Sequence, residues 1–288
     1  MATTGLNLQI NVENNLICYD DQGDSIIPII FIHGFPFDKT MWEPQRDYFR
    51  MAHRVISYDI QGFGRSTCNL EEASMDIFAD DLINLMDALN IKNAVVCGLS
   101  MGGFIALNAI NRYPQRFAGL VLCDTQCIAD SPETREKRME TIRVIEKDGL
   151  QEFTKSFIPN IFHENTFNDN KNLIKRIEAI IMSNNEKTVI KGMKALASRM
   201  ETCSSLSAIT VPTLIICGSD DKITPVEQSE AMLESIPNAS LKVIEEAGHL
   251  SNLEQSDEFN HHLENFMFEY LPSLNTVNNL DSEEEKIW

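Results

Sequence analysis

Residues 91–110 read IKNAVVCGLSMGGFIALNAI and change character at a single serine. Residues 95–97 form a short apolar, largely β-branched run, which predicts a buried strand. From position 101 the apolar residues recur at helical spacing until Pro114, so the second half predicts a helix. Ser100 therefore lies on the turn between a strand and a helix.

The motif around this serine is G-x-S-x-G, and its strand-turn-helix context is typical of a nucleophile elbow. A turn this tight brings neighbouring backbone together, so a side chain at position 98 or 102 would clash. The turn lifts the serine hydroxyl at the carboxyl edge of the sheet and aims the first helical amides at the same point. Ser100 is therefore the candidate nucleophile.

Apolar runs elsewhere in the chain alternate with helical patterns. Residues 6–12 and 16–19 predict an antiparallel hairpin, and Ser74 can cap a helix with one apolar face. Further strands are predicted at 28–34, 54–60, 119–124, 213–218 and 241–246. This alternation predicts an α/β protein with a mostly parallel central sheet and helices on both faces.

Between Asp124 and Pro212 the strand pattern disappears. Four helical patterns follow one another there, at 131–149, 150–162, 170–183 and 186–200. We therefore expect an all-helical cap, inserted after the sixth strand, that lies above the sheet. The expected division is a core of residues 1–126 and 206–272, a cap of residues 127–205, and a mobile acidic tail of residues 273–288.

A serine hydroxyl is a weak nucleophile and needs a general base, which in turn needs a group that fixes its tautomer. His249 follows the last predicted strand, where a loop can reach the carboxyl edge, and is the candidate base. The orienting acid should follow the preceding strand, which offers Asp220 and Asp221 in the chain order Ser, Asp, His. Asp124, at the end of an earlier strand, is a further alternative.

The composition limits the partners and the compartment. The formal net charge of −19 and pI near 4.7 oppose binding to nucleic acid or to an anionic membrane surface. The seven cysteines are scattered, and those at 97, 123 and 217 lie in strand-like runs. They predict small core residues rather than a disulfide framework or a metal site, in a reducing compartment. No signal peptide or spanning segment is evident, which predicts a cytoplasmic protein.

Five motifs together resemble the capped α/β-hydrolases over nearly the whole chain. They are HGFP at 33–36, DIQGFGRS at 59–66, GLSMGG at 98–103, GSDDKITP at 218–225 and AGHL at 247–250. The resemblance implies a Ser-His-Asp triad of Ser100, His249 and Asp221, the last chosen because the family's acid stands three residues after the glycine of G-x-x-D. It also implies an oxyanion hole from the backbone N–H groups of Phe35 and Met101.

The same resemblance gives two of these motifs structural roles. His33 would hold the oxyanion loop by hydrogen bonds. Asp59, Arg65 and Ser66 would shape the loop of residues 59–66. A serine rather than an aspartate at position 100 argues against the haloalkane dehalogenase and epoxide hydrolase branches.

The expected reaction is hydrolysis of a small or medium carboxylic ester or lactone through an acyl-enzyme on Ser100, without a metal or organic cofactor. The HGFP loop and the segment KALASR, which ends at Arg199, are similar to 3-oxoadipate enol-lactonases and aryl-esterases. Phe35, Phe157 and Arg199 are the expected substrate contacts. Arg199, Lys194 and Lys155 are the candidates to bind a substrate carboxylate.

Other functions are compatible with the same residues. A C–C bond hydrolase, a thioesterase or a perhydrolase side reaction would use the same triad. A receptor-like member would bind a small ligand in the capped pocket without turnover, and an interaction protein would depend on the acidic tail. The sequence leaves the physiological substrate and the oligomeric state open.

Overall fold

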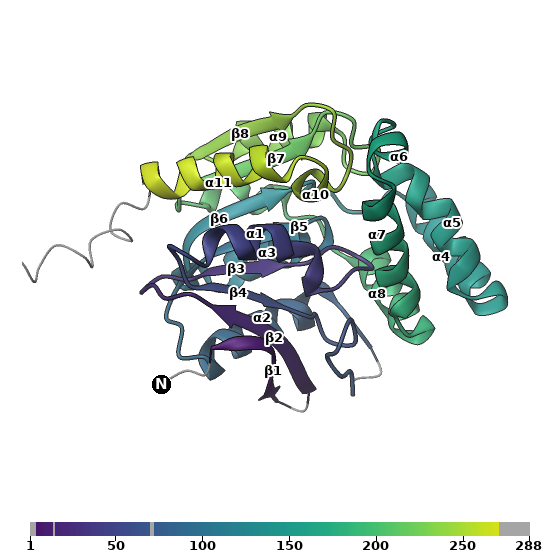
Figure 1. The fold of residues 1–288 in the computed structure, drawn as a ribbon, viewed down its shortest axis with the longest axis horizontal. Helices are drawn as coiled ribbons and strands as arrows, with labels where there is room; N and C mark the ends of the chain where they lie inside the picture. The colour runs from purple at the N-terminus through teal and green to yellow at the C-terminus, as the bar shows by residue number, and fades with distance from the viewer. Residues whose placement is uncertain (1–3, 14, 70–71, 271–288) are drawn as a thin grey trace, which may run out of the picture.

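The computed structural model describes residues 4–13, 15–69 and 72–270 and shows a central sheet with helices on both faces and a group of helices at one end (Figure 1). The sheet has eight strands in the order β1-β2-β4-β3-β5-β6-β7-β8. Their bounds are β1 Gly5–Val12, β2 Asn15–Gln22, β3 Ile29–Ile32, β4 Val55–Tyr58, β5 Ala94–Leu99, β6 Phe117–Cys123, β7 Thr213–Gly218 and β8 Ala239–Ile244. The predicted α/β class is confirmed.

Only the first two strands depart from the parallel arrangement. β1 pairs with β2 as an antiparallel hairpin, and β2 is antiparallel to β4. All the other neighbours are parallel, so the strands from β3 to β8 end at one edge of the sheet. Every residue of β3, β4, β5 and β7 is buried, as expected for strands covered on both faces.

The helices outside the cap cover the two faces of the sheet. α1 packs against α11 on one face, and α2 packs against α3 on the other (Figure 1). As the sequence predicts, the hydroxyl of Ser74 caps α2 by accepting the Ile77 N–H at 3.2 Å. The bounds are η1 Lys39–Trp42, α1 Glu43–Phe49, α2 Met75–Ala88, α3 Met101–Arg112, η2 Pro114–Arg116, η3 Cys203–Ala208, α9 Val226–Ser235, α10 Ser251–Glu254 and α11 Ser256–Tyr270.

The segment between β6 and β7 is helical throughout its regular structure, as predicted. It consists of α4 Pro132–Asp148, α5 Leu150–Ile161, α6 Thr166–Asp169, α7 Lys171–Ser183 and α8 Glu186–Ser198, with η3 on the return to β7. These helices lie together beyond one edge of the sheet (Figure 1). We propose residues 127 and 205 as the limits of this cap. The predicted tail, residues 273–288, lies outside the described residues.

The cysteines correct one sequence prediction. Cys97, Cys123 and Cys217 are buried strand residues, as expected. However, Cys127 and Cys203 form a disulfide across a sequence separation of 76 residues, which the scattered spacing did not suggest. The two cysteines meet because the cap leaves the core and returns to it at the same place. This disulfide removes the ground on which the sequence predicted a reducing compartment.

Because the disulfide closes a long loop, its loss should destabilise the protein through the unfolded state. The loop-entropy relation gives about 4.5 kcal/mol as an upper value for a loop of this length. We therefore expect the Cys127→Ser/Cys203→Ser double variant to melt roughly 5 to 10 °C below the wild type in calorimetry. Dithiothreitol should lower the melting temperature of the wild type and leave that of the double variant unchanged; equal effects on both would contradict the pairing.

Candidate active site

Ser100 lies on the predicted turn between β5 and α3. Its backbone has φ 55° and ψ −113°, a left-handed conformation that costs energy in a residue with a side chain. A Cβ added at Gly98 would overlap the Gly102 carbonyl, and one added at Gly102 would overlap the Ile32 carbonyl. The two glycines therefore permit the turn, and the turn directs the hydroxyl toward the cap.

His249 meets Ser100 from the loop that follows β8. Its Nε2 lies 2.8 Å from the Ser100 hydroxyl, and the imidazole is buried. Two N–H groups of this loop are bound: the His249 N–H donates to the Ile161 carbonyl at 3.0 Å, and the Gly248 N–H donates to Glu254 Oε1 at 2.7 Å. The position of the imidazole thus depends on the end of α5 in the cap as well as on the core.

The geometry separates the rival carboxylates. Asp221 Oδ2 lies 2.8 Å from His249 Nδ1 and also accepts the Thr224 hydroxyl at 2.6 Å. Its Oδ1 accepts two backbone N–H groups, from Ile223 and Thr224. Asp220 instead bonds Ser219 at 2.6 Å and its side chain is 49% exposed. The structure thus brings together Ser100, His249 and Asp221.

Charge interactions within this group set the protonation of the histidine. Burial alone would lower the pKa of His249, but the adjacent Asp221 carboxylate, with smaller contributions from Asp124 and Glu254, outweighs burial and raises this pKa above its usual 6.5. Burial opposes ionisation of Asp221, but the charge of the imidazole and the hydrogen bonds from His249 and Thr224 reverse that effect, so the pKa of Asp221 is lowered. A carboxylate on Nδ1 leaves Nε2 of the neutral ring free to accept the serine proton.

The predicted oxyanion donors are backbone amides on two neighbouring segments. Met101 begins α3, so its N–H is among the first four, which have no partner inside the helix. Neither this amide nor that of Phe35 donates to the backbone of any residue that the structure describes. His33 holds the Phe35 loop as expected: its Nε2 accepts the Ile60 N–H at 3.0 Å and its Nδ1 lies 2.8 Å from the Gly34 carbonyl. Burial lowers the pKa of His33 to about 4, so the ring is neutral.

Asp59 shapes the neighbouring loop, in line with its predicted structural role. Its two carboxylate oxygens accept the backbone N–H groups of Lys39 at 2.8 Å and Arg65 at 2.9 Å. The Ser66 hydroxyl donates to the Asp59 carbonyl at 2.7 Å. These contacts are all within the loops, and none reaches Ser100.

A cavity of about 580 Å³ lies over Ser100 and His249, between the sheet edge and the cap. Its apolar wall includes Phe35 and Phe157, as expected, together with Phe104, Phe153, Met193 and Leu196. Three basic residues, Lys137, Arg138 and Lys222, also line it. Such a volume suits a small or medium ligand.

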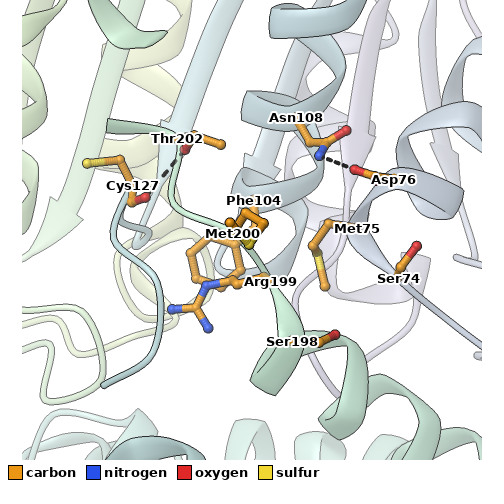
Figure 2. Close-up of a pocket in the computed structure, with 10 residues that line it drawn as sticks. All are labelled: Ser74, Met75, Asp76, Phe104, Asn108, Cys127, Ser198, Arg199, Met200 and Thr202. Carbon is orange, nitrogen blue, oxygen red and sulfur yellow. Dashed lines mark hydrogen bonds between the residues drawn. The ribbon is translucent and has the colours of Figure 1, made fainter. Parts of the chain in front are cut away.

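Arg199, an expected substrate contact, does not line this cavity. Its side chain is 2% exposed and its guanidinium bonds Asp130 Oδ1 at 2.5 Å, 4.3 Å from the centre of the Phe104 ring. It borders a smaller pocket of about 80 Å³, which Phe104 also lines and where the Thr202 N–H donates to the Cys127 carbonyl (Figure 2). Arg199 thus joins the two ends of the cap, and the sequence-based assignment to substrate is corrected.

The other two basic candidates are also placed elsewhere. Lys155 is exposed and pairs with Glu152 at 2.5 Å, and Lys194 borders a separate surface pocket with Glu72 and Glu146. The basic residues that do line the cavity lie on α4 and in the loop after Asp221. α4 is charged around most of its circumference, so its sequence alone did not reveal which face turns inward.

Within the described ranges no group of three or more His, Cys, Asp or Glu side chains could hold a metal ion. Over the same ranges, no helix is both long enough and apolar enough to cross a membrane.

The chain is similar in sequence and in fold to several known hydrolases. The chain is 30% identical over 231 residues to 3-oxoadipate enol-lactonase 1 of Acinetobacter baylyi, covering 80% of this chain and 85% of the relative. It is 27% identical over 273 residues to a 2-hydroxy-6-oxononadienedioate/2-hydroxy-6-oxononatrienedioate hydrolase of a Pseudomonas species, covering 88% and 92%. A solved structure of a thermophilic esterase from Thermogutta terrifontis, with malate bound, superposes with a TM-score of 0.87 at 33% identity, covering 91% of this chain and 97% of that one.

The family model described as serine aminopeptidase, S33, matches residues 29–256, which include the elbow, the cap and the loops of Asp221 and His249. The fold, the motifs and the relatives point the same way. The chain belongs to this family of α/β-hydrolases.

Proposed function

We propose that the protein hydrolyses a small or medium carboxylic ester or lactone through an acyl-enzyme on Ser100. The observation that carries the proposal is the continuous chain of contacts from Asp221 through His249 to the Ser100 hydroxyl, each 2.8 Å long, at the floor of the capped cavity. The enol-lactonase and the esterase among the similar proteins support the ester and lactone class.

In the proposed reaction His249 takes the proton of Ser100 as its oxygen attacks the substrate carbonyl. The amides of Phe35 and Met101 stabilise the oxyanion, and Asp221 stabilises the imidazolium. His249 then protonates the leaving alkoxide, and afterwards activates the water that releases the acid. Each amide donor typically contributes about 3 kcal/mol to the barrier reduction.

The basic residues of the cavity favour a substrate that carries a carboxylate. Arg138 is bound by Asp130 at 2.5 Å, but Lys137 and Lys222 form no ion pair with any described residue. In a chain of net charge −19, two uncompensated lysines at a cavity mouth attract an anionic substrate. We place Lys137 and Lys222 as its contacts.

A C–C bond hydrolase is the second candidate. The Pseudomonas relative is named a hydrolase of a 2-hydroxy-6-oxo dicarboxylate, a compound with no ester bond, so its hydrolysis breaks a C–C bond, and the same triad can serve that reaction. A ligand-binding protein without turnover is a third, but the aligned triad counts against it. The two enzymatic candidates differ in substrate and not in the residues that would act.

Replacing the nucleophile should abolish turnover. We expect Ser100→Ala to lower kcat for p-nitrophenyl acetate and butyrate by about four to six orders of magnitude, since the triad acts as a unit. The measurement is release of p-nitrophenol, with melting temperature as the control for folding. A Ser100→Ala variant as active as the wild type would rule out the acyl-enzyme on Ser100. A wild type that does not cleave these esters but does cleave a vinylogous diketone would favour the C–C hydrolase.

The raised pKa of His249 predicts the acid limb of the pH profile. The protonated imidazole cannot act as a base, so kcat/KM should rise with pH through a midpoint above the usual 6.5. Asp221→Asn removes the charge that raises this pKa; the midpoint should move to lower pH while kcat falls by about 10⁴-fold. A profile that is flat between about pH 5 and pH 8 would exclude His249 as the base.

The lysines of the cavity predict a preference for anionic substrates, which can be measured by comparing a charged ester with a matched neutral ester. Lys137→Gln and Lys222→Gln should each reduce kcat/KM for a monoester of a dicarboxylic acid by roughly threefold to fivefold, and leave the matched neutral diester unaffected, since exposed charge pairs are worth up to about 1 kcal/mol. Lys155→Gln, a lysine outside the cavity, is the matched control. An equal loss of kcat/KM for the monoester and the diester would show that the lysines do not bind the substrate carboxylate.

A further inference from the structure

A second buried carboxyl group lies beneath the proposed triad. Asp124 follows β6 directly, is fully buried and has a positive φ of 44°. Its backbone N–H donates to the Ile216 carbonyl at 2.9 Å, which extends the pairing of β6 with β7. The proposed reaction makes no use of this side chain.

Its two oxygens bond two different loops. Asp124 Oδ1 accepts the Gly218 N–H at 2.9 Å, and Oδ2 lies 2.6 Å from the Ser251 hydroxyl. Gly218 ends β7, three residues before Asp221, and Ser251 begins α10, two residues after His249. One side chain is therefore bonded to the segment that carries the acid and to the segment that carries the base.

The same two segments also touch directly. The Asp220 N–H donates to the Ala247 carbonyl at 2.9 Å, and a Cβ at Gly218 would overlap the carbonyls of Ala247 and Gly248. The backbones of the two segments are in direct contact. The two hydrogen bonds from Asp124, one to each segment, therefore fix the position of one segment relative to the other. We propose that Asp124 is a positioning residue, which holds the Asp221 loop and the His249 loop at the separation that their hydrogen bond needs.

The protonation state of Asp124 suits a residue that acts through hydrogen bonds rather than through its charge. Burial, together with the Asp221 carboxylate, raises the pKa of Asp124 to about 8, although His249, Ser251 and Gly218 oppose the shift. The thiols of Cys123 and Cys217 are the remaining titratable neighbours. At neutral pH the side chain is therefore mostly an uncharged acid. Its carbonyl oxygen accepts the Gly218 N–H, and the bond to Ser251, which the serine donates to an ionised Asp124, then runs from the acid O–H to the Ser251 oxygen. Asparagine offers the same acceptor and donor in the same shape.

This role presupposes the proposed triad, and paired variants test it. Asp124→Asn can keep both bonds, whereas Asp124→Ala removes both. We expect kcat of Asp124→Ala to fall by about 10- to 100-fold with KM within about twofold, since a misplaced catalytic group slows the chemical step. Asp124→Asn should stay within about threefold of the wild type with the same acid limb, because the charge is largely absent there. A folded Asp124→Ala variant with wild-type kcat would overturn the proposal.

A readout independent of turnover separates this proposal from the proposed function. The downfield proton resonance of His249 Nδ1–H reports its bond to Asp221, so Asp124→Ala should weaken or shift it and Asp124→Asn should retain it. Asp81→Asn, which neutralises a buried carboxyl of raised pKa on α2, is the matched control and should not change it. A resonance that is unchanged in Asp124→Ala refutes the positioning role. If Asp124→Ala loses the resonance and the wild type cleaves no ester, the positioning role is supported and the ester-hydrolase function is refuted.

If Asp124→Ala does not fold, Ser251→Ala decides the question. It deletes only one hydroxyl and leaves the Gly218 bond in place. We expect a smaller fall in kcat, of roughly threefold to tenfold, and the same direction of change in the resonance. No change in either quantity would overturn the proposal.

Discussion

The contact between the backbone of Gly102 and the carbonyl of Ile32 is the constraint on which the site depends. Ile32 ends β3, and the HGFP loop with the Phe35 amide follows it directly, while Gly102 lies two residues after Ser100. Because no side chain separates these backbones, the nucleophile and both proposed oxyanion donors are held by one interface. Any residue larger than glycine at position 102 would separate them.

A second constraint links the base to the cap. The His249 N–H bonds the Ile161 carbonyl, and Glu254 accepts N–H groups from Gly248 in the core and from His163 in the cap. The imidazole therefore stands at the junction of the two parts of the protein. The Cys127–Cys203 disulfide and the buried Arg199–Asp130 pair hold the two ends of the cap together, so the cap is tied to the core at two places.

The sequence predicts the sheet and the three central residues for one reason: each residue lies on the turn or loop that follows a strand, and parallel strands end at the same edge. The residues alone could not choose between Asp220 and Asp221, which differ only in the direction a tight turn gives them; the family resemblance made that choice. Arg199 was misassigned and the Cys127–Cys203 pair was missed for a different reason. Their positions depend on how the cap packs on the core, and helical periodicity carries no information about that packing.

Two buried aspartates, Asp124 and Asp130, have opposite protonation states because their neighbours differ. Asp130 lies between two guanidinium groups, which outweigh its burial and lower its pKa, so it is ionised and ties the ends of the cap. Asp124 is more deeply buried and lies beside another carboxylate, so its pKa rises to about 8. A negative charge on Asp124 would compete with the Asp221 carboxylate for the His249 imidazole. An uncharged Asp124 can form hydrogen bonds to both loops without this competition. Where a structural carboxyl group must stand next to a catalytic one, burial thus removes the conflict by keeping only one of them charged.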